Sequence, residues 1–411
     1  MKTKVIIVGA GPVGLLLGNL LGRNNVPTLI LEKELDEKKW SRAIGITPPS
    51  LEIFREIGLD KKFVRNGIRG YKAIFKNTYF KLGSIKIKNL PSLYPFILSI
   101  SQFTTEKFLE ENLKKYDCIK LFRGYEVEDM EYDEPWILIK CQNKKDSKKY
   151  VFFSEIVCAC DGEKSIVRKL IGVPFLGSYY KPTFIMGDYH DVSEYKDNAV
   201  LWFTEKGSVE SFPLPYKQRR WIIQTPEFIK SPKIGYLEKI VYQRTGFRLN
   251  LRDKISENSF GVQHFLAKRY YKRKIFLCGD AAHTMAPIGG QGMNSGFADA
   301  EFLSYIITAY INDSRLNFKF LAIQYEYYRK RAAKSATFRA DLGMRIGTAR
   351  GWIFSYLRSI LLFLILHSTI VQLLVPFFTM INIPYNRITR VLEKKNLKKC
   401  ALNKGKDNNY S

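Results

Sequence analysis

The chain has 411 residues, of which 46% are hydrophobic, and a formal net charge of +27. This length and apolar content predict a globular protein of two domains and exclude a disordered or fibrous chain. The basic residues are scattered and form no recognition motif, so nucleic acid is not an expected partner. The high positive charge reflects either a bias in amino-acid composition or a role in attracting the protein to an anionic membrane face or to acidic substrates.

The cysteine and histidine residues indicate the cellular compartment and whether a metal site is expected. The six cysteines form no CxxC pair and the four histidines are isolated, so we expect reduced thiols and no metal site. The first four residues lead directly into an apolar run at residues 5–8, which leaves no room for a signal peptide. These observations predict a cytoplasmic protein.

The N-terminal stretch carries a glycine motif in the setting of a nucleotide-binding unit. Two apolar strands and a helix between them are predicted at residues 5–8, 28–31 and 15–21. The loop after the first strand reads GxGxxG, in which Gly9 permits the turn, Gly11 lets a pyrophosphate approach the backbone, and Gly14 lets helix and strand pack closely. Glu32 ends the second strand and can accept hydrogen bonds from the hydroxyls of an adenosine ribose. The stretch predicts a dinucleotide site without choosing between NAD and FAD.

The middle of the chain alternates between two kinds of pattern. Residues 70–100 and 173–265 show polar–apolar alternation and dense aromatic residues, which predict the strands of a second sheet. Most of these aromatic residues are expected in its core, and a few are expected to line an apolar substrate pocket. Residues 105–113 predict an amphipathic helix, and a strand at 156–159 precedes Asp161. Asp161 either fixes a loop near the pyrophosphate or caps the helix that follows it.

A second glycine loop follows far downstream. An apolar strand at 275–277 precedes Gly279 and Asp280, and residues 295–310 predict a helix. Because a carboxylate repels phosphate, Asp280 is better suited to accept hydrogen bonds from the hydroxyls of a sugar or ribityl chain. The segment 287–294 leads into the helix N-terminus and is expected beside a group that becomes negative. A second sugar anchor about 250 residues after the first fits a long cofactor, which favours FAD over NAD.

The C-terminal part changes character. Residues 323–345 predict a helix with a basic face, and residues 359–386 contain no charged residue, a length sufficient to span a bilayer. Pro376 interrupts this run, and basic residues flank it on both sides. A single membrane pass would put one basic flank outside, contrary to the positive-inside tendency. Two alternatives stay open: a helical hairpin dipping into the cytoplasmic membrane face, or two helices packed on the protein or on a partner in a homodimer.

The motifs at residues 9–14, 160–168 and 279–294 resemble, in sequence and order, those of the class A flavin-dependent aromatic hydroxylases. The likeness is to the phenol hydroxylase and 3-(3-hydroxyphenyl)propionate hydroxylase branch and covers about residues 1–340. It implies an α/β fold with a Rossmann-like FAD-binding domain of the glutathione-reductase type, as in p-hydroxybenzoate hydroxylase. That domain is interleaved with a mixed β-sheet substrate domain and followed by C-terminal helices. The implied domains are 1–69, 101–172 and 266–340 for FAD, 70–100 and 173–265 for substrate, and 341–411 for the helical region with its basic tail.

The resemblance also implies a reaction. It is that of an FAD- and NAD(P)H-dependent monooxygenase, which hydroxylates an aromatic substrate, phenolic or polycyclic, with dioxygen through a flavin C4a-hydroperoxide. NAD(P)H binds only transiently in such enzymes. The alternative is a membrane-associated epoxidase or reductase acting on an isoprenoid or quinone lipid.

The sequence shows no catalytic acid–base pair, so the catalytic residues stay unassigned. The candidates nearest the flavin are Arg42, Gln102, His283 and Pro287, and His283 is expected to set its loop more than to move protons. The cofactor-binding residues that the motifs imply are Gly9, Gly11, Pro12, Val13, Gly14, Glu32, Lys33, Arg42, Gln102, Val127, Asp161, Gly279, Asp280, Pro287, Gly289, Gly290, Gln291, Gly292, Met293 and Asn294.

Overall fold

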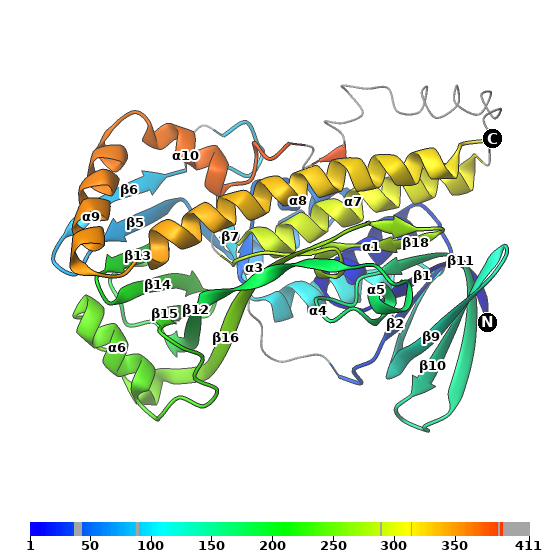
Figure 1. Ribbon diagram of the computed structural model, residues 1–411, viewed down its shortest axis with the longest axis horizontal. Helices are drawn as coiled ribbons and strands as arrows, with labels where there is room; N and C mark the ends of the chain where they lie inside the picture. Colours follow the sequence, from blue (N-terminus) through cyan, green and yellow to red (C-terminus); the bar gives the residue numbers. More distant parts are fainter. Residues whose placement is uncertain (37–42, 88–89, 288–289, 314, 385–386, 389–411) are drawn as a thin grey trace.

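The computed structural model describes residues 1–36, 43–87, 90–287, 290–313, 315–384 and 387–388. Its strands form three sheets, and two long helices, α7 (Gln291–Asn312) and α8 (Phe318–Thr348), run side by side across the molecule from one large sheet to the other (Figure 1). The sheets and helices give the predicted α/β class. The functional loops lie where α7 begins, between the two large sheets.

The first large sheet contains the strands of the N-terminal motif. Its order is β17-β18-β11-β1-β2-β8, with the β9–β10 hairpin joined to β11. β1 is parallel to both β2 and β11, and its residues Val5, Ile6 and Ile7 are fully buried, as expected of a strand covered on both faces. The strands are β1 (Lys2–Val8), β2 (Thr28–Glu32), β8 (Ile119–Arg123), β9 (Tyr125–Asp133), β10 (Trp136–Asn143), β11 (Lys149–Ala159), β17 (Tyr271–Lys272) and β18 (Ile275–Leu277).

The second large sheet follows the order β19-β16-β12-β15-β14-β13-β5-β6. Helix α6 (Tyr236–Thr245) covers one of its faces, where Trp202 and Trp221 stack with ring centroids 5.5 Å apart in the apolar core. The strands are β5 (Lys72–Lys76), β6 (Lys81–Lys86), β12 (Phe175–His190), β13 (Ala199–Thr204), β14 (Gly207–Leu214), β15 (Gln218–Thr225), β16 (Lys254–Ala267) and β19 (His283–Thr284). The opposite face turns towards α8 and the second glycine loop.

A third, small sheet lies between the two large ones and was not expected from the sequence. It has the order β3-β7-β4, formed by β3 (Gly45–Ile46), β7 (Ile97–Ser99) and β4 (Ile68–Gly70). The prediction that residues 70–100 belong wholly to the second sheet is therefore wrong for β7. The physical reason is local, since the Ser99 hydroxyl donates to the Pro213 carbonyl 2.5 Å away, which fixes β7 across the end of β14.

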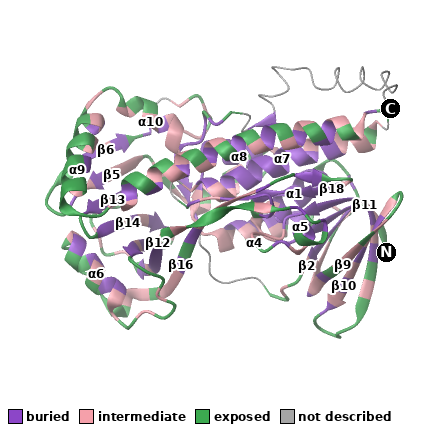
Figure 2. Cartoon of the chain, in the orientation of Figure 1, coloured by how far each residue is buried: buried purple, intermediate pink, exposed green. Residues whose placement is uncertain are grey.

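The shorter helices pack around these sheets. They are α1 (Pro12–Arg23), α2 (Pro48–Glu56), α3 (Asp60–Asn66), α4 (Gln102–Leu113), α5 (Ile166–Leu170) and the single turns η1 (Leu251–Asp253) and η2 (Gly279–Ala281). Buried side chains concentrate around β1, α1 and α7 (Figure 2). The main core therefore surrounds the first glycine loop and holds it rigidly.

Helix α8 crosses residue 340 and continues unbroken to Thr348. After it, α9 (Trp352–His367) and α10 (Val371–Phe378) meet at an angle of 97°. Within the described residues no single helix has both the length and the apolar content to cross a membrane, although this bent pair has them together. Leu366 and Val375 pack onto β5 and β6, whereas most of α9 is exposed (Figure 2).

Candidate functional site

The first glycine loop combines two tight contacts with one open position. A Cβ added at Gly9, whose φ is +102°, would lie 2.5 Å from the Cys160 carbonyl oxygen, and one added at Gly14 would lie 2.0 Å from the Gly9 oxygen. Both positions therefore exclude any side chain. A Cβ at Gly11 would meet nothing within 4 Å. The open space over Gly11, at the N-terminus of α1, is where an anionic group can approach the backbone.

Glu32 closes this loop from the second strand. Its carboxylate accepts hydrogen bonds from the Ala10 backbone N–H at 2.7 Å and from the Glu34 N–H at 2.9 Å. A carboxylate has about four acceptor positions, so Glu32 keeps capacity for the two hydroxyls of a ribose. The neighbouring Lys33 is exposed.

The three sequence motifs converge in space. A Cβ on Gly279 would lie 3.1 Å from the Val13 side chain and one on Gly296 would lie 2.5 Å from it, so the second loop and α7 pack directly on the first loop. From the middle motif, Arg168 donates to the Ala281 carbonyl at 2.9 Å. Segments more than a hundred residues apart in the sequence are thus brought into direct contact.

Asp161 of the middle motif has one engaged and one unpartnered oxygen. Its Oδ2 accepts from the Val167 N–H at 3.2 Å, at the start of α5, as a helix cap does. Its Oδ1 is buried and has no partner among the described atoms. Burial raises the pKa of the Asp161 carboxyl above its ordinary value. The Asp161 backbone adjoins Gly9, and its unpartnered oxygen is an acceptor that a ligand can use, so both interpretations of Asp161 from the sequence fit its position.

A buried carboxylate that the sequence did not single out holds the second loop. Asp299 on α7 accepts from the Gly279 N–H at 3.0 Å and from Arg329 Nε at 2.6 Å, and His283 Nε2 lies 2.7 Å from the same carboxylate. Burial acts to raise the pKa of Asp299, but His283 and Arg329 together outweigh it, so that pKa lies below its ordinary value. His283 is fully buried in this cluster, which favours its expected role of setting the loop. Asp280 is exposed.

The segment before α7 is tied to the third sheet. Gly290 is the N-cap of α7, and the Asn294 side chain donates to the Gly45 carbonyl at 2.9 Å while its oxygen accepts from the Thr47 N–H at 2.9 Å. Gln291 is buried and its Oε1 has no partner among the described atoms. Gly292 and Met293 follow in the first turn of α7, and Pro287 is exposed. The predicted residues Arg42 and Gly289 lie outside the described residues.

Pro12 begins α1, and two further predicted residues lie on other elements. Gln102 begins α4, where its Nε2 donates to Glu106 at 2.8 Å and its backbone N–H donates to the Ala43 carbonyl at 3.1 Å. This contact places it beside the segment that follows Arg42. Val127 is buried on β9, opposite Cys141.

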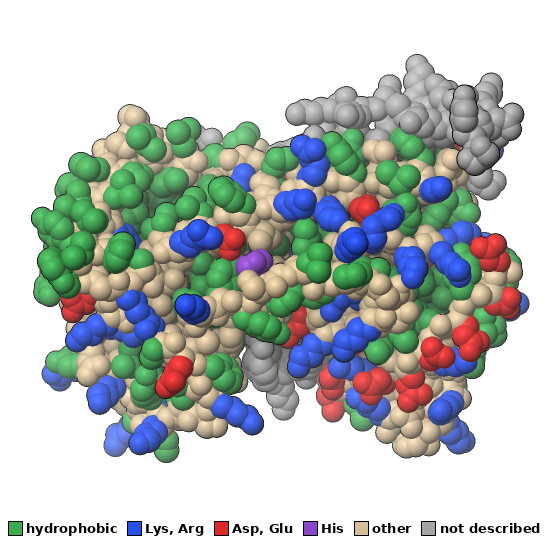
Figure 3. Space-filling view, in the orientation of Figure 1, with side chains coloured by type: hydrophobic (Ala, Val, Ile, Leu, Met, Phe, Trp, Pro, Cys, Tyr) green, Lys and Arg blue, Asp and Glu red, His purple; other side chains and the backbone are tan. Residues whose placement is uncertain are grey.

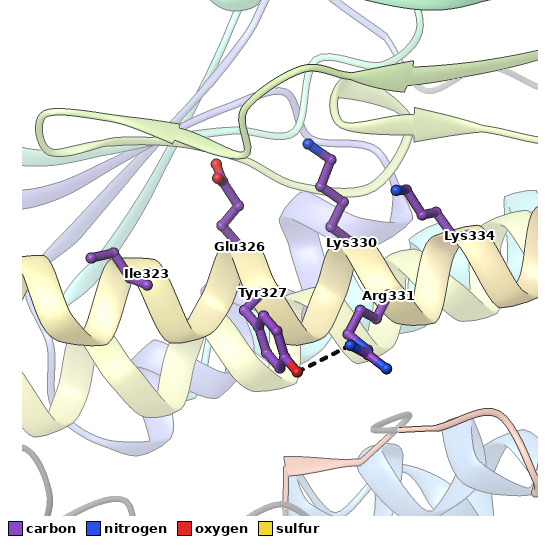
Figure 4. A pocket seen from close by; sticks show the side chains of 6 residues that line it. All are labelled: Ile323, Glu326, Tyr327, Lys330, Arg331 and Lys334. Atoms are coloured by element: carbon purple, nitrogen blue, oxygen red, sulfur yellow. Dashed lines mark hydrogen bonds between the residues drawn. The ribbon is translucent and has the colours of Figure 1, made fainter.

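A surface hollow of about 290 Å³ lies away from these loops, on the outer side of α8. Figure 4 shows its lining side chains, among them Tyr327, whose hydroxyl accepts a hydrogen bond from Arg331 at 3.1 Å. Glu326 and Lys330 in this hollow bind the chain around residues 268–270, with Glu326 accepting from the Tyr270 N–H at 2.7 Å. These contacts fasten α8 to the first sheet, so the hollow is part of the scaffold.

The residues present fit a bound FAD. The open space at Gly11 suits a pyrophosphate at the N-terminus of α1, and Glu32 retains acceptors for a ribose. Asp161 Oδ1 and Gln291 Oε1, on two of the converging motifs, are buried acceptors without a partner among the described atoms. A buried polar atom normally has a partner, so each of these acceptors suits a polar ligand.

Comparison with known families decides the cofactor. The family model described as "FAD binding domain" matches residues 2–340. The chain belongs to this FAD-binding family. The match confirms the choice of FAD over NAD and the extent of about 340 residues that the motifs predicted.

Similar proteins include a 3-(3-hydroxy-phenyl)propionate/3-hydroxycinnamic acid hydroxylase 2 of Burkholderia vietnamiensis. It is 27% identical over 359 residues, which cover 83% of this chain and 62% of the relative. The rifampicin monooxygenase of Streptomyces venezuelae is 26% identical over 315 residues, covering 75% of this chain and 64% of that protein. The chain therefore spans less than two thirds of the length of these relatives.

Solved structures confirm the fold. The p-nitrophenol 4-monooxygenase PnpA from Pseudomonas putida superposes with a TM-score of 0.83 at 19% identity, covering 92% of this chain and 98% of that chain. The flavin-dependent monooxygenase PieE, solved with FAD and substrate, superposes with a TM-score of 0.74 at 18% identity, covering 93% of this chain and 72% of its own.

Proposed function

We propose that this member of the FAD-binding family is a monooxygenase that uses NAD(P)H and dioxygen to hydroxylate an aromatic substrate. One oxygen atom replaces a ring hydrogen as a hydroxyl group. The other leaves as water, with two electrons from NAD(P)H and a proton from solvent. The observation that carries the proposal is the contact of Val13 with Gly279 and Gly296, which joins two nucleotide-type loops into one site for an extended flavin.

The chain's own groups bind and orient, and no nucleophile is required of them. FAD supplies the acceptance of a hydride from NAD(P)H and the activation of dioxygen. The N-terminus of α7 directs backbone N–H groups at developing negative charge, a contribution of about 1–2 kcal/mol in a partly buried site. The apolar cluster that includes Met186, Ala286 and Met344 keeps water from the space between the second sheet and α8.

We expect NAD(P)H oxidation by the FAD-loaded protein to accelerate when a hydroxyaromatic compound is added, because bound substrate completes the site. The measurement is the rate of NAD(P)H loss together with the mass of the product formed under isotopically labelled dioxygen. One labelled oxygen in the product is the expected result. A flavin that is reduced but yields no oxygenated product with any hydroxyaromatic tested would overturn the proposal.

We also propose that the exposed face of α9 and the start of α10 contacts an anionic membrane surface. The exposed apolar side chains of this face, the apolar face, are Trp352, Ile353, Phe354, Tyr356, Leu357, Ile360, Leu361, Phe363, Leu364, Ile370 and Leu373. Figure 3 shows hydrophobic side chains gathered at the left edge, where α9 lies. Residues 342–384 contain no acidic residue, and the chain carries a net charge of +27, which attracts anionic lipid and opposes contact between two copies. A membrane contact is the one feature that favours the lipid-substrate alternative.

We expect the protein to bind vesicles of phosphatidylcholine with phosphatidylserine more strongly than vesicles of phosphatidylcholine alone. The double change Leu361→Ser and Leu364→Ser should reduce this binding about tenfold or more, because each exposed leucine loses apolar contact worth about 1–2 kcal/mol. Leu176→Ser, at an exposed site on the second sheet, is the matched control, and flotation is the measurement. Unchanged flotation of the double variant would contradict the membrane assignment. So would light scattering that shows a dimer for the wild type and a monomer for the double variant.

A further inference from the structure

Among the described residues, Glu210 carries an unpaired carboxylate on the inner face of the second sheet. Along β14, Val209 and Ser211 point towards α6, where Val209 belongs to the core beneath that helix. Side chains alternate along a strand, so Glu210 and Phe212 point to the opposite face, which is the face turned towards α8 and the second glycine loop.

The neighbours of Glu210 are apolar and partly open. Strand register places Leu201 directly opposite it on β13 and Ile222 directly opposite it on β15. Directly paired residues share a face, with Cβ atoms about 5 Å apart. Leu201, Glu210, Phe212 and Ile222 are all half-buried, although the alternating residues of the same strands are buried. Partial exposure of this group of neighbours leaves the Glu210 side chain accessible from this face.

These neighbours of Glu210 lie beside the second glycine loop. Ile222 packs against the apolar cluster that contains Ala286, and Met285 packs against the same cluster. These two residues directly precede Pro287, a predicted flavin-proximal residue. On its other side, Leu201 packs against the cluster of Phe75 and Leu366 beneath α9. Glu210 therefore stands between two apolar walls, close to the segment that leads into α7.

Glu210 has no hydrogen-bond or ion-pair partner among the described residues. It is enclosed by protein without a compensating charge, and this burial raises the pKa of its carboxyl to about 7. A carboxylate that is desolvated and unpaired but still partly accessible is typical of a group that binds a ligand or transfers a proton. A purely structural carboxylate on this sheet looks different: Asp188, on the same face, is bound by both Arg220 Nε at 2.7 Å and Nη2 at 2.8 Å.

We infer that Glu210 binds the hydroxyl group of an aromatic substrate and takes up its proton during the reaction. The inference deepens the proposed function and rests on it. The ring of the substrate lies between Leu201, Phe212 and Ile222, and its O–H donates to the carboxylate. A substrate with its own carboxylate next to Glu210 is excluded from this site, because two like charges in apolar surroundings repel each other.

The proton transfer is balanced within the site. The O–H bond of the substrate breaks, its proton bonds to a Glu210 carboxylate oxygen, and the electron pair remains on the hydroxyl oxygen. That pair delocalises into the ring and makes the ortho and para carbons more nucleophilic, as attack on an electrophilic oxygen atom requires. After oxygen transfer the proton returns to the product or to solvent. A base whose pKa is near neutral suits both directions of this exchange.

The test measures binding, so that it is independent of turnover. 2-Naphthol and its methyl ether, 2-methoxynaphthalene, are titrated into the FAD-loaded protein by calorimetry at about pH 6 and about pH 8. We expect 2-naphthol to bind about fivefold tighter at the higher pH, because the ionised carboxylate makes the stronger hydrogen bond. The ether, which has no proton to donate, should bind more weakly than 2-naphthol and gain no affinity at the higher pH.

Glu210→Gln should abolish the pH dependence of 2-naphthol binding, whereas Glu205→Gln, an exposed residue in the turn before β14, should preserve it. Equal pH dependence in Glu210→Gln and the wild type would overturn the inference, as would equal affinity for 2-naphthol and its ether, or no saturable binding of 2-naphthol. Failure of the proposed monooxygenase reaction would appear separately, as intact 2-naphthol binding without oxygenated product.

Thermal unfolding without ligand provides a second measurement. The folded-state pKa of Glu210 is above its ordinary value of 4.5, so the folded protein loses stability as pH rises from about 4.5 to about 7. Glu210→Gln removes the buried charge and should raise the melting temperature at about pH 8 but not at about pH 5. A variant that melts lower at both pH values would show a paired, structural carboxylate and contradict the open site.

Discussion

Replacing Asp299 by alanine is expected to destabilise the protein by about 3–5 kcal/mol and to abolish retention of FAD. Asp299 is fully buried and is shared by the Gly279 N–H, His283 and Arg329. Its removal leaves the guanidinium of Arg329, itself 1% exposed, without its carboxylate in the interior. The same change frees Gly279, so the second glycine loop loses its conformation together with the global stability.

Urea unfolding and the flavin content of the purified variant measure these two effects. Asp313→Ala is the matched control, because Asp313 lies just beyond α7 in an exposed pair with Arg315, and its loss should cost less than about 1 kcal/mol. If Asp299→Ala kept its flavin and lost no more stability than Asp313→Ala, the cluster would not be what holds the loop.

Gly11→Val is expected to leave the fold intact and to weaken FAD binding about a hundredfold. Gly11 has φ −72°, a conformation open to any residue, and a Cβ there meets nothing within 4 Å. The stability of the ligand-free protein should therefore change by less than about 1 kcal/mol. The added side chain fills the space where the pyrophosphate approaches the helix N-terminus, and loss of those hydrogen bonds is worth about 3 kcal/mol.

Gly14→Ala is the contrasting variant. Its Cβ would lie 2.0 Å from the Gly9 oxygen, so helix and strand must separate and stability must fall with or without FAD. The paired measurement is the dissociation constant of FAD and the urea midpoint of each variant. Wild-type FAD affinity in Gly11→Val would show that the pyrophosphate does not lie on this loop.

The cofactor site was predictable because its chemistry depends on short local motifs. Gly9, Gly11 and Gly14 act through the backbone at fixed spacing, and Gly279 and Asp280 follow an apolar strand, so both loops could be placed without knowing the tertiary fold. That these loops meet at Val13 could only be inferred from the length of FAD.

Residues that act through tertiary contacts could not be predicted. Asp299 lies in a helix among small and apolar residues, and only its burial beside Arg329 marks it out. Glu210 depends on the register of three strands, because a slip of one residue would turn its side chain to the α6 face. The break between α9 and α10 has a similar cause: residues 359–386 are uniformly uncharged, and packing of Leu366 and Val375 on the second sheet sets the bend.

Hydrogen exchange of the backbone amides, with and without FAD, tests most directly whether both glycine loops hold one cofactor. We predict that FAD slows exchange at residues 9–14 and, at the same ligand concentration, at residues 279–283 and 290–294. The exposed tip of the β9–β10 hairpin, residues 133–135, should remain unchanged. Slower exchange at only one of the two loops, or at neither, would contradict a single FAD molecule bound across both.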